Sequence, residues 1–254
     1  MTRKLDYSYI WKDTQSQLAS HREGIAAITG VFLFLPDWVA QLFSGELDLS
    51  GAVGPSAMIA TLQEFFNQNW PILLPTGLLS MFGAAAIYVL LTRRDMATIG
   101  SALRQALILL PFYFLMQLVG GFATIFGLIL LIIPGFYIAG RLTPLAAVTV
   151  AETQLGVSGI VSRTWKLTEG NGWSIFFLAL VISLVASLTA MVIGMIVGLV
   201  CRVLAGPDGV PLIETGVNSA LGAVISAILI SLSVAIYRHL SADYSPSESR
   251  AKSV

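Results

Sequence analysis

One long apolar run decides the fold of this chain: SALRQALILLPFYFLMQLVGGFATIFGLILLIIPGFYIAGRLTPLAAVTVA, Ser101 to Ala151. A helix needs about 20 apolar residues to cross the hydrocarbon core of a bilayer, so a run of this length must cross twice and fold back once. Two pairs of residues can form the turn, Gly120-Gly121 and Pro134-Gly135. The choice between them sets the depth of every residue that follows.

A turn at Gly120-Gly121 gives a third span of ordinary length and a longer fourth span that Pro134 kinks. A turn at Pro134-Gly135 gives a third span of about 33 residues, which at 1.5 Å per residue overshoots the bilayer by roughly 20 Å. We therefore expect the turn at Gly120-Gly121, because tilt and a kink absorb a long helix more easily. The other placement would put Arg141 in the middle of its span, where its charge needs a buried partner.

Composition places the whole chain in a membrane. Of its 254 residues, 56% are hydrophobic and 11% are charged, about half the charged fraction of a soluble domain. The net charge of zero gives no reason to expect a nucleic-acid partner. One cysteine and two histidines leave too few ligands for a transition-metal site, and no cofactor is expected.

The sequence predicts an all-α polytopic membrane protein, a bundle of six transmembrane helices. The expected spans lie near 24–43, 70–91, 100–119, 122–151, 173–200 and 216–237.

Six crossings put both termini on one side, and the basic residues identify that side as the cytoplasm. The Lys and Arg residues on the side of the termini are Arg3, Lys4, Lys12, Arg22, Arg93, Arg94, Arg104, Arg163, Lys166, Arg238, Arg250 and Lys252. Only Arg202 falls on the opposite side, and the first external loop, 44–69, carries Glu46, Asp48 and Glu64 but no base. By the positive-inside rule the termini are cytoplasmic.

A polar segment near 156–169 predicts an amphipathic helix on the cytoplasmic side, lying along the membrane. Apolar residues recur there at helical spacing, and Trp165 stands beside Arg163 and Lys166. After it and the last two spans, the Ser-rich segment 241–254 is expected to be a disordered cytoplasmic tail.

Arg141 is the basic residue expected inside a span, which makes it a candidate for function. Two interpretations stay open: a structural anchor that reaches the interface, or a contact to an anionic group such as a lipid phosphate. Glu152 cannot pair with it directly, because eleven residues of helix separate them by about 16 Å. We expect Glu152 instead to lie close to Arg163 or Lys166.

Two further groups of residues bear on movement and packing. Pro134 and Gly135 mark either a kink that improves packing or a hinge where unwound backbone binds a ligand. Gly194 and Gly198 form a GxxxG in the fifth span, and Gly222 lies in the sixth, so we expect these small residues at helix contacts within the bundle.

Enzyme signatures are missing from the sequence. It contains no HExxH, no GxSxG, no phosphate-binding Walker loop and no cluster of acids within a span. We therefore expect a protein that is not an enzyme and has no catalytic residues.

The region around the Pro-Gly pair resembles a known group of six-span bacterial membrane proteins, the glycerophosphoryl diester phosphodiesterase membrane-domain family and the related YciC-like family. The segments IIPGFYIAGRLTPLAAVTVAE and KLTEGNGWSIFFLAL carry the resemblance. The matching positions are Pro134, Gly135, Arg141, Glu152, Ser162 and Gly170. The resemblance implies an integral protein of the bacterial inner membrane. We recognise no segment like the catalytic domain to which some relatives are fused, and we therefore expect no hydrolase activity to be inherited.

Two functions are compatible with these observations. The first is an organiser of membrane lipids or of a protein partner at the cytoplasmic face, with Arg141, Arg163 and Lys166 contacting anionic head groups. The second is a transporter or channel for a small or amphipathic solute, gated near Pro134-Gly135. The second requires a polar cavity at membrane depth, lined by groups such as Gln105, Tyr113, Gln117, Thr124 and Arg141.

Overall fold

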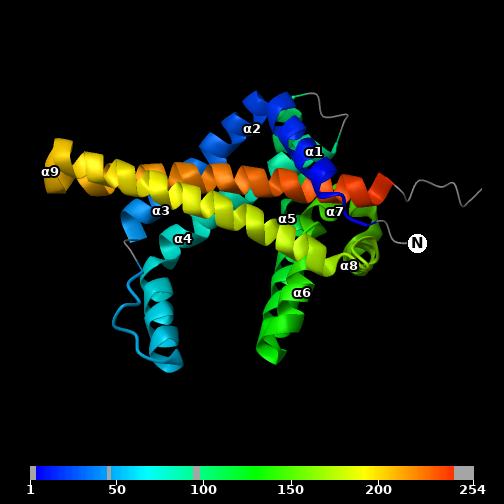
Figure 1. The fold of residues 1–254 in the computed structure, drawn as a ribbon, viewed down its shortest axis with the longest axis horizontal. Helices are drawn as coiled ribbons and strands as arrows, with labels where there is room; N and C mark the ends of the chain where they lie inside the picture. Colours follow the sequence, from blue (N-terminus) through cyan, green and yellow to red (C-terminus); the bar gives the residue numbers. More distant parts are fainter. Residues whose placement is uncertain (1–3, 45–46, 94–97, 243–254) are drawn as a thin grey trace, which may run out of the picture.

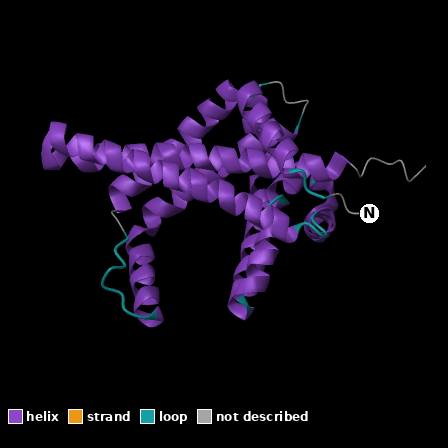
Figure 2. Ribbon diagram, in the orientation of Figure 1, coloured by secondary structure: helices purple, strands orange, loops and turns teal. Residues whose placement is uncertain are grey.

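A computed structural model describes residues 4–44, 47–93 and 98–242. Within the last range, only the backbone is described for residues 202 and 204–211. Within these ranges the regular structure is entirely helical (Figure 2). Six helical segments are long and apolar enough to cross a membrane: 22–44, 55–92, 99–130, 132–151, 172–201 and 212–241. The all-α polytopic fold is therefore confirmed. Several residues used above lie outside the described ones: Arg3, Glu46, Arg94, Arg250, Lys252, the side chain of Arg202, and the expected disordered tail from 243 onward.

The chain begins with helix α1 (Tyr7–Ser20), which starts where the Asp6 carboxylate accepts a hydrogen bond from the Tyr9 N–H at 3.0 Å. The first span follows as α2 (Arg22–Ile28), the π-helical turn η1 (Thr29–Phe34) and α3 (Leu35–Ser44). Pro36 explains the irregular turn, because it has no N–H to give to the preceding turn of an α-helix.

Helix α4 (Pro55–Thr92) is longer than the expected second span. The segment 44–69, expected as a loop, is helical from Pro55 onward, which corrects that prediction. Pro55 at the first helical position and Gly54 with φ 94° before it start the helix early. At about 1.5 Å per residue, α4 is longer than the bilayer is thick, so the polar residues of its first turns extend beyond the apolar part.

The turn between the third and fourth spans lies at Leu131, so the predicted turn at Gly120-Gly121 is wrong. Helix α5 (Ile99–Leu130) runs straight through both glycines, and α6 (Ile132–Leu142) starts one residue beyond Leu131. Pro134 favours this place, since in the first turn of a helix its missing N–H costs no hydrogen bond. Gly135 allows α6 to fold back closely, because an added Cβ would lie 2.6 Å from the backbone nitrogen of Leu128. Gly120 is instead a contact point, where an added Cβ would lie 2.6 Å from the Leu145 side chain.

The fourth span is broken once more, between α6 and α7 (Leu145–Ala151). A single turn of 3₁₀-helix, η2 (Thr153–Leu155), then leads into α8 (Gly156–Leu167), which occupies the place expected for the amphipathic helix. One side of α8 is buried, with Ile160, Thr164 and Leu167, whereas Ser162 and Lys166 are exposed on the other. Buried and exposed residues of α8 thus recur with the helical period, as the sequence indicates.

Helix α9 (Gly172–Ser241) contains both of the last two spans. It reverses its direction, so that its two arms, Gly172–Cys201 and Leu212–Ser241, run side by side (Figure 1). In the most apolar stretch of each arm, 6% of the residues are buried in the first arm and 56% in the second. The second arm is therefore the centre of the bundle and the first arm contacts lipid.

The core forms where the second arm of α9 meets the C-terminal half of α4, α5 and α7. Small side chains such as Ala85, Ala86, Ala147 and Ala227 allow these helices to approach closely. The α5–α6 hairpin and the N-terminal half of α4 project from this core on one side of α9 (Figure 1). At the hairpin's end, Leu130 to Ile133 are 65–75% exposed, a surface that is stable in lipid but not in water.

Candidate functional site

Arg141 lies near the middle of the fourth span by residue count, nine residues after Ile132 and ten before Ala151. It is only 6% exposed and is enclosed by protein groups. Its guanidinium carbon stands 3.9 Å from the centre of the Trp165 ring and 5.6 Å from that of Tyr137. Its Nε donates to the Thr168 hydroxyl at 3.2 Å, and its Nη atoms donate to the Tyr137 hydroxyl at 3.4 Å and to the Trp165 backbone oxygen.

These contacts connect α6 to the C-terminal end of α8. The Trp165 carbonyl is among the last carbonyls of α8, which lack partners within the helix and carry the negative end of its dipole. A cation at this position satisfies the carbonyl and stabilises the helix end. The buried partner that a central Arg141 requires is thus a helix terminus and an indole ring, and Arg141 positions α8 against the bundle.

The structure places the other two candidate cations differently. Arg163 forms an ion pair with Glu152, its Nε lying 3.2 and 3.1 Å from the two carboxylate oxygens, as expected from the sequence. The Tyr237 hydroxyl donates to the same carboxylate at 3.1 Å, which links α8 to the second arm of α9. Lys166 is exposed. Of the three cations expected to contact lipid, only Lys166 has its side chain on the surface.

The residues expected to act as a hinge or at helix contacts also have defined places. Pro134 lies in the first turn of α6 and Gly135 packs against Leu128, so both belong to the turn of the α5–α6 hairpin. A Cβ added at Gly194 would lie 2.9 Å from the Asn218 amide oxygen, and one at Gly198 would lie 3.6 Å from the Glu214 carboxylate. Both glycines of the GxxxG therefore lie against the other arm of α9. Gly222 is exposed and has no atom within 4 Å of such a Cβ, so the helix contact expected there is wrong.

An open cavity of about 470 Å³ lies between the helices and is lined by residues of η1, α4, α5, the α6–α7 break and both arms of α9. We call it the polar cavity, because eight of its fourteen lining residues carry a hydroxyl or an amide and none of these described residues is charged. The eight are Ser80, Tyr88, Tyr113, Gln117, Thr143, Ser183, Ser226 and Ser233. Measured along the axis of α4 from its end at Thr92, Tyr88 lies about 6 Å and Ser80 about 18 Å into the helix. The wall of the cavity extends between these two residues.

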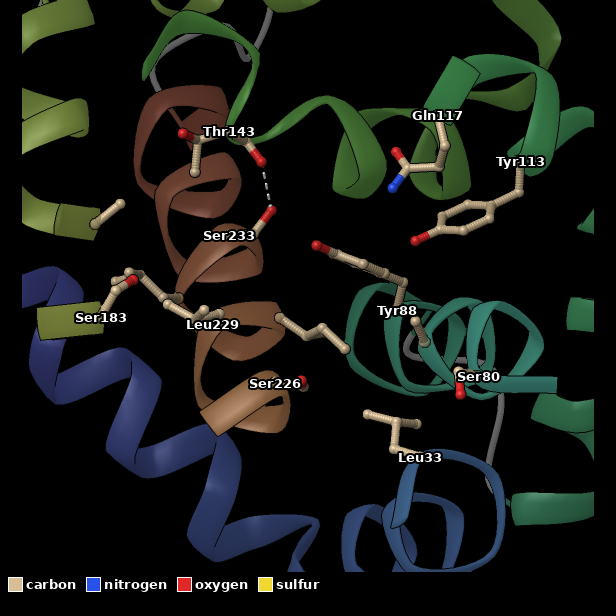
Figure 3. Close-up of a pocket in the computed structure, with 14 residues that line it drawn as sticks. Leu33, Ser80, Tyr88, Tyr113, Gln117, Thr143, Ser183, Ser226, Leu229 and Ser233 are labelled. Carbon is tan, nitrogen blue, oxygen red and sulfur yellow. Dashed lines mark hydrogen bonds between the residues drawn. The ribbon is translucent and has the colours of Figure 1, made fainter. Parts of the chain in front are cut away.

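The strongest polar groups of this cavity converge on one space (Figure 3). The hydroxyls of Tyr88 and Tyr113 and the amide of Gln117 come from α4 and α5. They point into the space between these two helices and Ser233 of α9. Polar groups facing empty apolar space cost several kcal/mol, roughly 2–7 by transfer scales. Such a space suits water or a polar ligand.

A helix break forms part of the wall. Thr143 and Pro144 separate α6 from α7, and Pro144 has no N–H to continue the helix. The Thr143 carbonyl accepts a hydrogen bond from the Ser233 hydroxyl at 2.9 Å, so the second arm of α9 holds the break in place (Figure 3). Broken helices with freed carbonyls are where many membrane carriers bind their solutes.

A second cavity of about 390 Å³ adjoins the first and shares Gln117 and Thr143 with it. We call it the hairpin cavity, because it lies between the two helices of the α5–α6 hairpin and the start of α7. Its other lining residues are Gly120, Gly121, Thr124, Ile125, Ala139, Leu142 and Leu145. The Thr124 hydroxyl donates to the Gly120 carbonyl at 2.9 Å, so it is bonded within its own helix.

Sequence reasoning found part of this site. Of the five groups it named for a possible cavity, Tyr113, Gln117 and Thr124 line the two cavities, while Gln105 and Arg141 do not. It missed the break at Thr143-Pro144 and the serines of α4 and α9. The available signal was hydroxyl groups in otherwise apolar spans, a weak one, because such groups also bond to their own helix, as Ser226 does to the Gly222 carbonyl at 2.9 Å.

In the part of the chain that the structure describes, no group of three or more His, Cys, Asp or Glu side chains could hold a metal ion. No family model, curated protein or solved structure matches the chain. The resemblance to the phosphodiesterase membrane-domain and YciC-like families stays a prediction.

Proposed function

We propose that this membrane protein binds an uncharged polar molecule in the polar cavity and acts as a carrier for a small or amphipathic solute. The supporting observation is the convergence of Tyr88, Tyr113 and Gln117 on one space at membrane depth. Hydroxyls and an amide both donate and accept hydrogen bonds, which suits a ligand rich in hydroxyl groups. The uncharged wall disfavours an ion, whose desolvation it does not compensate.

The break at Thr143-Pro144 is the more suitable gate. Pro134 and Gly135 are not among the described residues that line the two cavities, whereas Thr143 lines both. Breaking the single hydrogen bond between the Ser233 hydroxyl and the Thr143 carbonyl frees the joint between α6 and α7. A movement there changes the shape of both cavities together.

The proposed role at the cytoplasmic face has less support from the geometry. Arg141 and Arg163 bind protein groups, so contact with anionic head groups falls to Lys166. Isolated basic residues near a membrane surface contribute about 1 kcal/mol each. Lipid binding by one such residue is too weak to define a function.

Cysteine accessibility tests the proposed function. Ser183→Cys places a thiol in the wall of the polar cavity, and Val185→Cys places one at similar depth on the outward face of the same turn, where the native side chain is 59% exposed. Both variants are made with the buried Cys201 replaced by alanine. We expect a hydrophilic methanethiosulfonate to modify the cysteine at 183 but not the one at 185, because thiolates form only in contact with water.

The same assay detects binding. Glucose, a small uncharged molecule with many hydroxyls, should slow modification at position 183, whereas choline chloride at equal concentration should not. Equal reactivity at the two positions, or equal protection by both solutes, would show that the cavity is not a site for uncharged polar groups.

A further inference from the structure

We propose that the solute carries hydroxyl groups on adjacent carbon atoms, as sugars and cyclic polyols do, and that Gln117 and Tyr113 of α5 bind them. This inference rests on the proposed function and extends it to the chemical class of the ligand and to the residues that select it.

The polar groups that line the polar cavity are of two kinds. In the first kind, the hydroxyl already donates to a backbone carbonyl. The Ser226 hydroxyl donates to the Gly222 carbonyl at 2.9 Å, within its own helix. The Thr143 hydroxyl donates to the Ala139 carbonyl at 3.1 Å, and the Ser233 hydroxyl to the Thr143 carbonyl at 2.9 Å. A hydroxyl has a single proton, so these groups cannot also donate to a ligand.

Gln117 and Tyr113 belong to the second kind. In the part of the chain that the structure describes, neither the Gln117 amide nor the Tyr113 hydroxyl forms a hydrogen bond with another protein group. Tyr113 is only 2% exposed, and a buried hydroxyl without a partner is costly and uncommon. Both groups point into the space between α4, α5 and Ser233 (Figure 3). The partner that they require is therefore a molecule in the cavity.

The spacing of these two residues selects the arrangement of the hydroxyls. Four residues apart on one helix, Gln117 and Tyr113 are neighbours on the same face, with Cβ atoms about 5–6 Å apart. An amide presents an acceptor oxygen and a donor nitrogen side by side, so Gln117 can accept from one hydroxyl and donate to the next. Both bonds form together when the hydroxyls are on adjacent carbons, because equatorial hydroxyls on alternate ring carbons are too far apart. The Tyr113 hydroxyl, one turn away, then reaches a further hydroxyl of the same ring.

Two isomeric cyclohexanetriols separate the position of the hydroxyls from their number. One isomer carries its hydroxyls on adjacent carbons and the other on alternate carbons, so the composition and the number of polar groups are the same. Protection of the Ser183→Cys thiol against the methanethiosulfonate measures their binding in membrane vesicles. We expect the adjacent isomer to protect at a concentration about three- to tenfold lower, the factor that one additional hydrogen bond gives.

Two substitutions remove the groups that bind the hydroxyls. Gln117→Leu should abolish the difference between the isomers, and Tyr113→Phe should weaken protection by the adjacent isomer by about threefold or more. Gln105→Leu is the matched control, because it makes the same change on the same helix at a residue that is not among the described residues lining the two cavities. It should alter neither value. Gln117→Met, close to glutamine in shape, repeats the test should Gln117→Leu fold poorly.

The outcomes distinguish this inference from the proposed function. If glucose protects but the two isomers protect equally in the parent protein, the inference is overturned and the proposed function stands. The inference also fails if the adjacent isomer keeps its advantage in both Gln117 variants, or if Tyr113→Phe leaves its protection unchanged. If glucose and both isomers leave the thiol unprotected, the proposed function itself fails.

Discussion

Replacing Arg141 by glutamine should destabilise the protein by about 2–4 kcal/mol. The substitution removes the charged donor to the Trp165 carbonyl, which keeps only the Thr168 hydroxyl at 3.4 Å, and a hydrogen bond from a charged group contributes about 1.5–3 kcal/mol. It also removes the stacking of the guanidinium on the Trp165 ring at 3.9 Å, which contributes roughly 0.5–2 kcal/mol. Relief from burying a charge offsets part of this loss.

The free energy of unfolding can be measured by titrating SDS into mixed micelles and following tryptophan fluorescence. Arg141→Lys should be intermediate, because an ammonium group keeps the charge but cannot reach the Trp165 carbonyl and the Thr168 hydroxyl with one planar fork. Lys166→Gln, a change to an exposed cation on α8, is the control and should lie within about 0.5 kcal/mol of the parent.

A double-mutant cycle isolates the ring contact. Arg141→Gln and Trp165→Leu together should destabilise less than the sum of the single changes, by roughly 0.5–2 kcal/mol. If Arg141→Gln is as mild as Lys166→Gln and the cycle shows no coupling, Arg141 does not hold α8. Retention of less anionic lipid by that variant would then indicate a lipid contact instead.

Three further tests concern the packing, the charges and the orientation in the membrane. Gly140→Ala should destabilise by about 1–3 kcal/mol, since the added methyl would lie 2.4 Å from a backbone oxygen of α9, whereas Gly222→Ala, which meets nothing, should be neutral or stabilising in the same unfolding titration. Glu152→Gln should cost only about 0.5–1.5 kcal/mol, because its ion pair is partly exposed, and a loss above 3 kcal/mol would show that the pair is effectively buried. The last test uses a protein without its native cysteine. Ser50→Cys should react with an impermeant maleimide from outside the cell, and Ser158→Cys should react only after permeabilisation. The reverse labelling would contradict the cytoplasmic placement of the termini.

The membrane class of this protein follows from local chemistry. Apolar runs of spanning length predict six crossings, because backbone groups in lipid must be satisfied within a helix. The alternation in α8 follows from helical spacing, and the pairing of Glu152 with Arg163 joins two residues on either side of a short connection. These features depend on residues that are close along the chain.

The place of the turn in the run Ser101 to Ala151 did not follow in the same way. Length alone favoured Gly120-Gly121, but a straight helix can continue through glycines when a neighbour needs the space, as Leu145 does beside Gly120. Pro134 sits at a helix start, and this shifts Arg141 to the centre of its span. The depth of that charge is thus decided by how two helices pack.

Arg141 illustrates the difference between what the sequence determines and what the tertiary structure determines. The sequence by itself determined that a cation lies within the fourth span and that a central position would demand a buried partner. Only the tertiary structure decided that the partner is the end of α8, 24 residues further along the chain, and that the polar cavity draws its wall from helices far apart in sequence. The physical reason is that helical period and hydropathy are local, whereas a buried hydrogen bond or a cavity wall requires side chains from several helices to meet.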